Sequence, residues 1–259
     1  RSNIEFAANN RLAETLRLAW GVEARHDAVA SRRYFNRDDD LSGTLARAWA
    51  NVEWRVAPAW LVNAGAMLEH HHYVGNDVSP RVALNYEFAP GHTLRAGVSQ
   101  AYRTPTFFEQ DGDFGYYSTT GLPLLQRVSP AASQLAPERI RSRELGYIAA
   151  LDEGRVQLDA RLFRDHIDHY IQAPGPRYVN GGAFRIQGGE GQLVWHPFEA
   201  LRVQLAYARV FVAAGADVDD DLPQSAPVNS GSAFASYDFG GGWSASAGSF
   251  KPRWPFVPT

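Results

Sequence analysis

The sequence contains no cysteine and no long uninterrupted apolar run. Without cysteine there are no disulfides, no thiolate nucleophile and no cysteine-ligated zinc or iron–sulfur site, and either redox compartment remains open. A membrane-spanning helix needs about 18 to 20 consecutive apolar residues. Arg, Asp, Glu or Gly interrupts every such stretch here, so the class of helical membrane proteins is excluded.

An excess of positive charge is also missing. The chain has 25 Lys and Arg against 28 Asp and Glu, which gives a net charge of -3. This balance argues against a polyanion as the main partner, so nucleic acid is not expected. Residues 1–5 do not begin a signal peptide, and the start is interpreted as a mature terminus or a cut.

The sequence is rich in apolar residues, which make up 45% of the chain. Its 259 residues are enough for one large β domain or for two domains of ordinary size. The apolar residues alternate with polar residues at a period of two, which is typical of strands with one apolar face. We count about twelve such segments and no convincing helix, so the predicted fold class is all-β. The segments cover residues 4–8, 15–28, 46–56, 60–70, 82–88, 94–103, 145–151, 156–162, 193–195, 201–207, 234–239 and 243–250.

The connections alternate between short and long. Tight turns are expected at residues 9–14, 57–59, 89–92, 152–155, 196–200 and 240–242. Long loops are expected at residues 29–44, 71–79, 104–139, 172–183 and 213–229. Short turns at one end of a sheet and long loops at the other are typical of barrels in the bacterial outer membrane.

Aromatic residues lie near both ends of the expected strands, as in the two interfacial girdles of a membrane barrel. The group near the tight turns comprises Trp54, Trp60, Phe88, Trp195, Phe198, Tyr237, Phe239 and Trp243. The group near the long loops comprises Tyr34, Phe35, Tyr73, Tyr102, Tyr170 and Phe211. A soluble antiparallel sandwich or barrel would show the same alternation. Strand length, loop asymmetry and the aromatic groups favour the membrane barrel.

Several short motifs follow one another in a set order between residues 99 and 201. They comprise Ser99, Tyr102, Arg103, Pro105 and Glu109; residues 135–138 (LAPE); Glu144, Gly146 and Tyr147 within residues 144–147 (ELGY); residues 163–171; Asn180 with residues 188–191 (GGEG); and residues 196–201 (HPFEAL). In order and spacing they resemble the barrel of TonB-dependent outer-membrane receptors.

That resemblance implies an antiparallel barrel of the 22-stranded type, with an N-terminal plug domain and a segment that contacts TonB. The plug, the TonB-contacting segment and the last strands are not visible, so residues 1–259 are expected to form a partial barrel with two open edges. The implied function is binding of a scarce ligand, most often a ferric siderophore, and its import with TonB-supplied energy. The implied partners are TonB, the ferric siderophore and outer-membrane lipid; no enzymatic activity, cofactor or metal is expected.

Charged residues recur on the polar side of the strands. Because a dry core could not accept them, they are expected to face a water-filled lumen. They are Glu23, Arg25, Arg47, Glu53, Arg55, Arg81, Glu87, Arg95, Glu144 and Asp159. A passive porin would use the same lining, so this row leaves both transport mechanisms open.

Two groups of residues near the long loops are candidate ligand contacts. The first is His70, His71, His72 and Tyr73, either a solvated loop root or a contact for a metal or iron chelate. Successive side chains of a strand point to opposite faces, so His71 faces away from His70 and His72 and the three cannot coordinate one metal unless the strand has ended before them. The second is Phe107, Phe108, Tyr116 and Tyr117 in the longest loop, where rings suit a flat chelate or anchor the rim.

Other motif residues are interpreted as structural, namely Tyr102, Arg103, Pro105, Glu109, Glu144, Gly146 and Tyr147. Arg103 and Pro105 are expected to fix where the strand leaves the sheet. An outer-membrane hydrolase stays as an alternative, because an acid and an imidazole could activate water at Asp165 with His166 or at Asp168 with His169. The runs at residues 38–40 and 217–221 are interpreted as solvated acidic loops, with a divalent cation as the alternative.

Overall fold

The computed structural model describes residues 1–117, 123–218 and 221–253. One antiparallel sheet of twelve strands dominates it, in the order β1-β2-β3-β4-β5-β6-β9-β10-β13-β14-β15-β16. These strands are β1 (Ser2–Ala13), β2 (Leu16–Val29), β3 (Leu41–Ala57), β4 (Trp60–His71), β5 (Gly75–Ala89), β6 (His92–Arg103), β9 (Glu138–Leu151), β10 (Val156–Asp168), β13 (Phe184–Phe198), β14 (Leu201–Ala214), β15 (Asn229–Gly240) and β16 (Trp243–Arg253). The all-β prediction is therefore confirmed.

The smaller elements all lie in connections. They are the pairs β7 (Phe114–Tyr117) with β8 (Pro123–Val128) and β11 (Ile171–Gln172) with β12 (Val179–Asn180), the helices α1 (Arg32–Phe35) and α2 (Phe107–Asp111), and the 3-10 turns η1 (Asp152–Gly154) and η2 (Leu222–Gln224). The sequence analysis identified neither helix. Each is shorter than two turns, so a period of 3.6 cannot be recognised in it.

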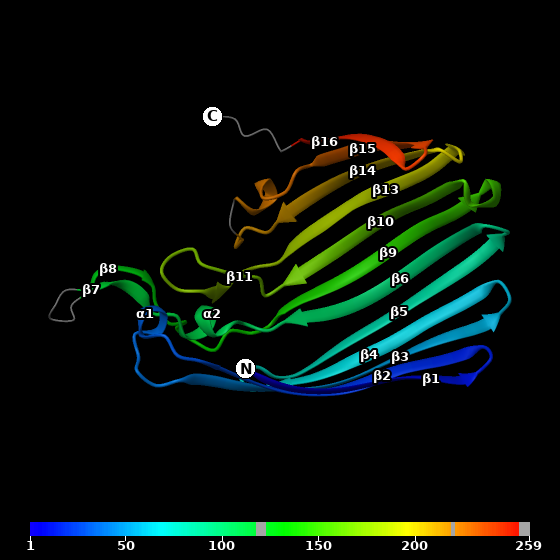
Figure 1. Ribbon diagram of the computed structural model, residues 1–259. Coiled ribbons are helices and arrows are strands. Elements are labelled where there is room, and N and C mark those ends of the chain that lie inside the picture. The colour runs from blue at the N-terminus through cyan, green and yellow to red at the C-terminus, as the bar shows by residue number, and fades with distance from the viewer. Residues whose placement is uncertain (118–122, 219–220, 254–259) are drawn as a thin grey trace.

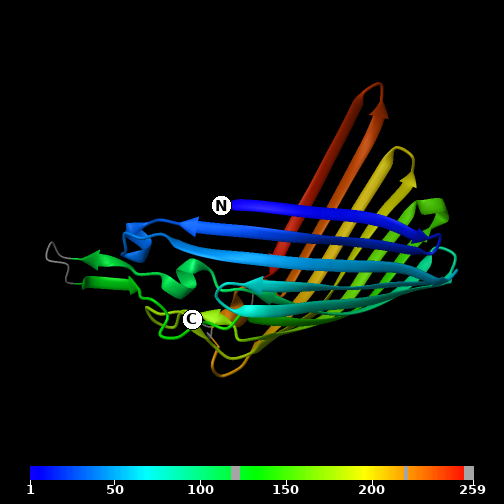
Figure 2. The same ribbon diagram turned by 90° about the horizontal axis from the view of Figure 1, so that it is seen from below.

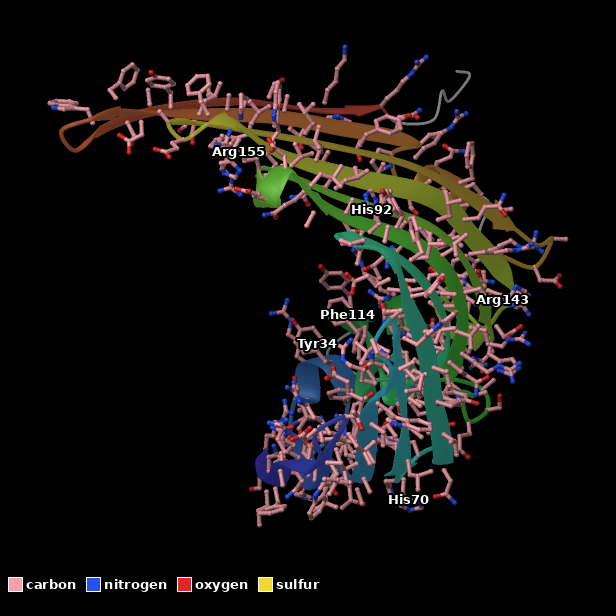
Figure 3. All side chains as sticks on the ribbon, turned by 90° about the vertical axis from the view of Figure 1, so that its right-hand side faces the viewer. Tyr34, His70, His92, Phe114, Arg143 and Arg155 are labelled. Carbon is pink, nitrogen blue, oxygen red and sulfur yellow. The ribbon has the colours of Figure 1, made fainter. Side chains whose placement is uncertain are left out.

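The sheet bends into an open trough whose two edges are β1 and β16 (Figures 1 and 2). Register fixes its faces, because residues paired across neighbouring strands point the same way. One row runs from Leu16 through Trp54, Val62, Leu84, Ala96 and Leu145 to Leu162. Arg143 shares this face by alternation, and it stands on the convex side (Figure 3). The convex face is therefore the apolar one.

The apolar face has no second layer over it among the described residues. Large side chains such as Val82, Leu145 and Leu162 stay exposed there. The buried residues gather instead mostly around the long-loop ends of the strands, where Leu45, Leu135 and Ile171 lie. A sandwich would seal its apolar face against another sheet, so that alternative is wrong.

Short turns and long loops alternate along the chain as expected, with one exception. The loop expected at residues 71–79 is only three residues long, because β5 begins at Gly75 and His71 pairs with Gly75. The first residues of β5 are mostly polar, so they lack the apolar–polar alternation that predicts a strand. They still pair with β4, because backbone hydrogen bonds do not depend on side-chain polarity. Gly75 has φ +80°, which the tight reversal requires.

The two aromatic groups behave differently. The group near the tight turns stands on the convex side, where Trp54, Trp195 and Trp243 are exposed and Trp60 stacks on Tyr86 at 4.1 Å between ring centroids. The group near the long loops does not form a second girdle. Tyr34 and Phe35 belong to α1, and the ring of Tyr170 packs against Phe184. In this group, alternation places only Tyr102 and Phe211 on the convex face of the sheet.

Among the described residues, no helix is long and apolar enough to cross a membrane.

Candidate ligand-binding site

The long connections gather into one loop assembly beyond the strand ends. It contains α1, α2, the β7–β8 pair and the loop bearing β11 (Figures 1 and 2). Backbone bonds hold its parts together: the Asp113 N–H donates to the Tyr34 carbonyl at 2.9 Å, and the Ala131 N–H to the Gln110 carbonyl at 2.9 Å. Segments far apart in sequence thus form a single surface.

Arg103, the last residue of β6, anchors this loop assembly to the sheet. Its Nε and Nη2 donate to the two carboxylate oxygens of Glu138 at 2.6 and 2.7 Å. Its Nη1 donates to both oxygens of Glu109 at 3.0 Å. Glu138 also accepts the Ile171 N–H at 2.8 Å. One planar guanidinium therefore ties β6, α2, β9 and β11 together, and such forked pairs are geometrically specific.

Glu109 has a second task at the start of α2. Thr106 caps the helix by accepting the Glu109 N–H at 3.2 Å, while the Glu109 carboxylate accepts the Thr106 N–H at 2.8 Å. This is a capping box. Burial opposes ionisation, but the bonds from Arg103 and Thr106 outweigh it and lower the pKa of Glu109. The carboxylate is therefore charged at neutral pH.

Two polar side chains that the sequence analysis did not single out as site residues also fix the loops. Gln110 accepts the Leu135 N–H at 2.9 Å and donates to the Ser133 carbonyl at 3.3 Å. Asn180 accepts the Ala136 N–H at 2.7 Å and donates to the Ala136 carbonyl at 2.9 Å. Each side-chain amide supplies hydrogen-bond partners to loop backbone groups that have no partner in the sheet. No local sequence pattern predicts such contacts.

An aromatic cluster fills the interior of the loop assembly. Phe108 on α2 meets Tyr34, Phe35 and Tyr178 at centroid distances of 6.1, 6.3 and 6.2 Å, all edge-on. Tyr34 also lies 5.7 Å from Phe114 on β7. Edge-to-face pairs of this kind stabilise by about 0.5 to 1.5 kcal/mol each. The cluster therefore links α1, α2 and β7.

The three histidines predicted as candidate contacts point in different directions. His70 bonds Asn76 at 2.8 Å, whereas His71 accepts the Tyr73 N–H at 3.1 Å. His72 lies past the end of β4, and its ring is edge-on to Tyr73. Across the described residues, no group of three His, Asp or Glu side chains could hold a metal ion. The structure therefore lends no support to direct metal capture here.

The aromatic candidates divide into packed and exposed rings. Tyr73 donates to Asp111 at 3.1 Å, and burial together with that carboxylate raises the pKa of Tyr73. Phe107 packs edge-on against Tyr73 at 5.5 Å, and Phe108 occupies the cluster described above. Tyr116 is 58% exposed, with Arg127 5.7 Å above its ring. The side chain of Tyr117 lies outside the description.

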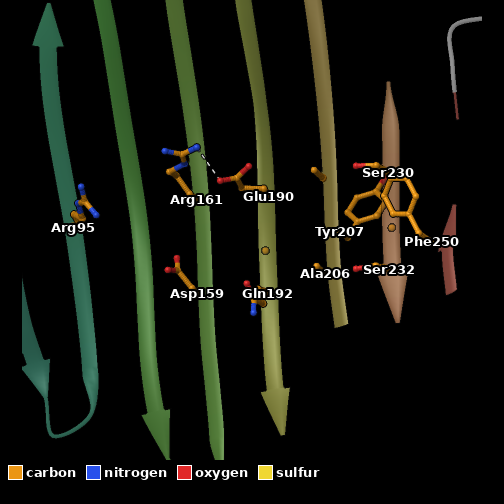
Figure 4. Close-up of a pocket in the computed structure, with 13 residues that line it drawn as sticks. Arg95, Asp159, Arg161, Glu190, Gln192, Ala206, Tyr207, Ser230, Ser232 and Phe250 are labelled. Atoms are coloured by element: carbon orange, nitrogen blue, oxygen red, sulfur yellow. Dashed lines mark ion pairs between the residues drawn. The ribbon is translucent and has the colours of Figure 1, made fainter. Parts of the chain in front are cut away.

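The concave face carries a ladder of ion pairs across neighbouring strands. Arg47 pairs with Glu23 and Glu69 at 3.2 and 3.3 Å. Farther along the sheet, a second run links Arg95 to Glu144 at 2.9 Å, Glu144 to Arg161 at 3.4 Å, and Arg161 to Glu190 at 2.8 Å. Figure 4 shows the Arg161–Glu190 pair and Arg95 of this run, which line a hollow of about 480 Å³. The charged residues predicted to face a lumen therefore share the concave side.

The remaining motif residues lie in two places: Gly146 and Tyr147 toward the short-turn end of β9, and Tyr102 and Pro105 at the long-loop end of β6. Gly146 is buried, and a side chain there would meet the Cβ of Arg95 at 3.6 Å. The Tyr147 hydroxyl lies 2.7 Å from His92 Nδ1. Pro105 is buried two residues after Arg103, and Gln100 donates to the Tyr102 hydroxyl at 3.0 Å.

The acid and imidazole pairs are not arranged for hydrolysis. Asp165 and His166 point to opposite faces of β10. His166 contacts Asp168 at 3.0 Å, but Arg139 and Arg141 hold that carboxylate at 3.0 and 2.9 Å. His169 lies past the strand in the left-handed region, with φ +55°.

The acidic loop runs are partly described. Asp38 lies 3.5 Å from Arg32, and Asp39 pairs with Arg37. Asp217 offers its backbone carbonyl to Gln172 at 2.8 Å. Asp219 and Asp220 lie outside the described residues. Asp38 and Asp39 thus pair with arginines of the same loop, whereas the printed contact of Asp217 is made by its backbone.

Comparison with known families decides the relationship. The family model described as TonB dependent receptor-like, beta-barrel, matches residues 4–257. The chain belongs to the TonB-dependent receptor family. This TonB-dependent receptor barrel lies in the bacterial outer membrane, its convex face against lipid and its concave face around the lumen. The family's fold and its relatives are those of transport receptors, so the chain is not an enzyme.

Curated relatives and solved structures agree with this placement. The barrel is 23% identical over 219 residues to the iron-regulated outer membrane virulence protein of Vibrio cholerae, covering 84% of this chain and 31% of that protein. It is 28% identical over 83 residues to the ferric enterobactin receptor of Pseudomonas aeruginosa, covering 32% and 11%. It is 25% identical over 114 residues to the vitamin B12 transporter BtuB of Vibrio cholerae, covering 44% and 18%.

The fold matches the crystal structure of the siderophore receptor PirA from Pseudomonas aeruginosa. The TM-score is 0.75 at 16% identity, over 96% of this chain and 44% of that one. The chain thus spans less than half the length of these relatives.

Proposed function

We propose that the receptor captures a ferric siderophore at its loop assembly and imports it with energy supplied through TonB. One observation carries the proposal: the receptor-barrel family matches almost the whole chain, at residues 4–257. Relatives named as an iron-regulated outer membrane protein and a ferric enterobactin receptor support an iron chelate as the ligand class. The name of a vitamin B12 transporter among the relatives makes cobalamin the competing ligand to test.

The loop assembly offers suitable chemistry for an anionic aromatic chelate. Tyr116 lies under Arg127 at 5.7 Å, and Tyr34, which is 47% exposed, lies under Arg33 at 5.9 Å. Each pair presents a flat ring beside a cation. Rings bind flat ligands by stacking, and guanidinium groups neutralise the charge of a chelate. We infer that these two pairs are ligand contacts.

We further infer that the described sheet is one part of the barrel domain and that a plug domain sits against its concave face. The ion-pair ladder supports this, because polar side chains on a curved inner wall can contact either water or a polar protein surface. Arg95 and Arg161 line the hollow in Figure 4 and are partly exposed, so a plug could reach them.

A deletion strain grown under iron limitation tests the function. Complementation with the full-length gene should restore growth on one ferric siderophore and uptake of radiolabelled iron from it. Both should be lost in a strain without TonB. Uptake that persists without TonB would identify a passive channel. Growth rescue by cobalamin alone would show that the ligand is a cobalamin and not a siderophore.

A further inference from the structure

The loop between β10 and β13 contains an asparagine followed directly by a glycine, Asn180–Gly181. Each of the other asparagines in the sequence precedes a residue that has a side chain. An asparagine before glycine is especially prone to deamidation, because no side chain hinders attack of the glycine nitrogen on the asparagine amide carbon. Asn180 is therefore the residue at which this chain could modify itself most readily.

The reaction needs only the protein and water. The Gly181 nitrogen loses its proton and forms a bond to Cγ of Asn180. The bond from Cγ to Nδ2 breaks, and ammonia leaves with that proton. Water then opens the resulting cyclic imide at either of its two carbonyls, which leaves aspartate or isoaspartate at position 180. One amide and one water are thus exchanged for one carboxylate and one ammonium ion, with no oxidation or reduction.

Both reacting groups are held by hydrogen bonds in the structure. The Gly181 N–H donates to the Tyr170 carbonyl at 2.6 Å. Asn180 Oδ1 accepts the Ala136 N–H at 2.7 Å, and Nδ2 donates to the carbonyls of Ala136 and His169, each at 2.9 Å. The side-chain amide therefore has partners for its oxygen and for its N–H groups. Attack requires these bonds to break, so the closed loop assembly protects the site.

Opening of the loop assembly is enough to expose the pair. Asn180 pairs with Ile171 between β12 and β11, and the Ile171 N–H donates to Glu138, which Arg103 holds. Asn180 and Gly181 are only half-buried. Loops open locally at a lower free-energy cost than the strands of a sheet. Reaction at position 180 should therefore follow opening of the loop assembly and should not require unfolding of the barrel.

The product would prevent the loop from closing again. A carboxylate has no N–H, so the carbonyls of Ala136 and His169 would lose their donor and would face a negative charge instead. A buried polar group without a partner is unfavourable. Isoaspartate also lengthens the main chain by one carbon, which disrupts the pairing of this position with Ile171. The reaction thus removes the contacts that protect its own starting state.

We propose that Asn180–Gly181 is a deamidation site, protected while the loop assembly is closed and converted when it opens. The conversion is irreversible, so it accumulates with the age of the receptor. It leaves the loop between β10 and β13 permanently loosened. The site does not depend on which ligand the receptor imports, because it rests on contacts within the chain.

The first test follows position 180 in the full-length receptor at mildly alkaline pH, where the attacking nitrogen loses its proton more readily. Mass spectrometry of proteolytic peptides measures aspartate and isoaspartate there. Conversion in the folded receptor should be about tenfold slower than in urea-unfolded receptor, because only the opened loop reacts. This comparison uses the unaltered sequence. Equal rates in the folded and unfolded receptor would overturn the proposal.

Arg103→Met tests whether opening of the loop assembly controls the reaction. It frees Glu138 and should move the rate at position 180 in the folded receptor toward the rate in the unfolded one. Asn229 is the control within the same sample, because it lies in β15 of the main sheet and precedes the small residue Ser230. Its rate should be the same with and without the substitution. No acceleration at position 180 would contradict control by loop opening.

A product mimic tests the consequence. Asn180→Asp carries the carboxylate from the start and should be cleaved faster than the unaltered receptor by added protease within residues 169–183. Asn229→Asp is the matched control for the added charge and should be cleaved there at the unaltered rate. Heat-modifiable migration on a gel reports that the barrel of each variant is folded. Equal cleavage of the two variants would show that conversion does not loosen the loop.

Discussion

At the scale of single residues, Arg103 has the most connections among the motif residues. One guanidinium donates four hydrogen bonds to two carboxylates. Glu109 in turn accepts the N–H of Thr106 at the start of its own helix, and Glu138 accepts the N–H of Ile171 on β11. Lysine could supply the charge but not the planar fork. The loop assembly therefore depends on the shape of this side chain as well as on its charge.

Replacing Arg103 should loosen the loops and spare the barrel. In Arg103→Met we expect faster cleavage by added protease within residues 104–137, and siderophore affinity lowered about tenfold. The physical reason is that Glu109 and Glu138 are left partly buried without a cation, at a cost of about 1 to 3 kcal/mol. Heat-modifiable migration on a gel should stay normal, and Arg103→Lys should fall between the two. Unchanged cleavage in Arg103→Met contradicts this anchoring role.

The pKa of Glu109 gives the loop assembly a dependence on pH. Because the folded value is depressed below 4.5, ionised Glu109 contributes stability that is fully present above 4.5 and is lost as pH falls through the folded pKa. We expect hydrogen exchange in residues 104–113 to accelerate below pH 4.5 relative to the strands. In Glu109→Gln the exchange should be faster at neutral pH and should depend less on pH. Equal pH profiles in the two proteins would show that another group controls the loop.

Among the predicted ligand contacts whose side chains the structure describes, Tyr116 has the most exposed aromatic ring. Tyr116→Ala should weaken siderophore binding two- to fivefold, which corresponds to an exposed ring–cation pair of about 0.5 to 1 kcal/mol. Isothermal titration with the full-length receptor measures it. Tyr207→Ala is a suitable control, because Tyr207 is similarly exposed but faces lipid. An equal loss in both variants would indicate a general destabilisation.

At the scale of elements, each strand of the sheet separates two environments. On β5, Val82 faces lipid while Asn85 faces the lumen, only three residues away. An arginine near the membrane midplane on the lipid side costs about 2 to 4 kcal/mol, whereas a lumen position is tolerant. The same substitution should therefore have opposite consequences at the two positions.

We expect Val82→Arg to reduce the amount of folded receptor in the outer membrane and Asn85→Arg to leave it near the unaltered level. Quantitative blotting of outer-membrane fractions, with heat-modifiable migration as the folding readout, measures both. Reduced folding in Asn85→Arg with normal folding in Val82→Arg would reverse the assignment of faces.

At the scale of the whole molecule, the sheet is open. In the described structure β1 and β16 each pair on one side only. An unpaired strand edge in lipid leaves its backbone groups without partners, which costs several kcal/mol per group. The trough therefore needs further strands to close it.

Residues 1–259 expressed alone should not form a soluble monomer. We expect aggregates or detergent-dependent species by size-exclusion chromatography, with no heat-modifiable closed form and no ligand uptake. A cooperatively folded, detergent-free monomer with Trp20 and Val62 shielded from a soluble quencher would contradict the membrane assignment.

Alternation in the sequence was enough to predict the all-β class and the two faces of the strands, because side-chain period follows directly from strand geometry. The tight turns at the other end of the sheet were also predicted, but the three-residue reversal between β4 and β5 was not. It also predicted the charged wall, since Arg47, Arg95 and Glu144 could not be buried dry. The length of β5 could not be read in this way, because its upper part is paired through backbone atoms and carries polar side chains.

The sequence by itself determined which face of each strand is apolar, because successive side chains of a strand point to opposite faces. Only the tertiary structure decided what happens between distant segments. It brought Arg103, Glu109 and Glu138 together, packed Tyr34 against Phe108, and set Arg143 opposite Arg164 across two strands. These contacts depend on strand register and loop path, which are properties of the whole sheet and leave no local pattern in the chain.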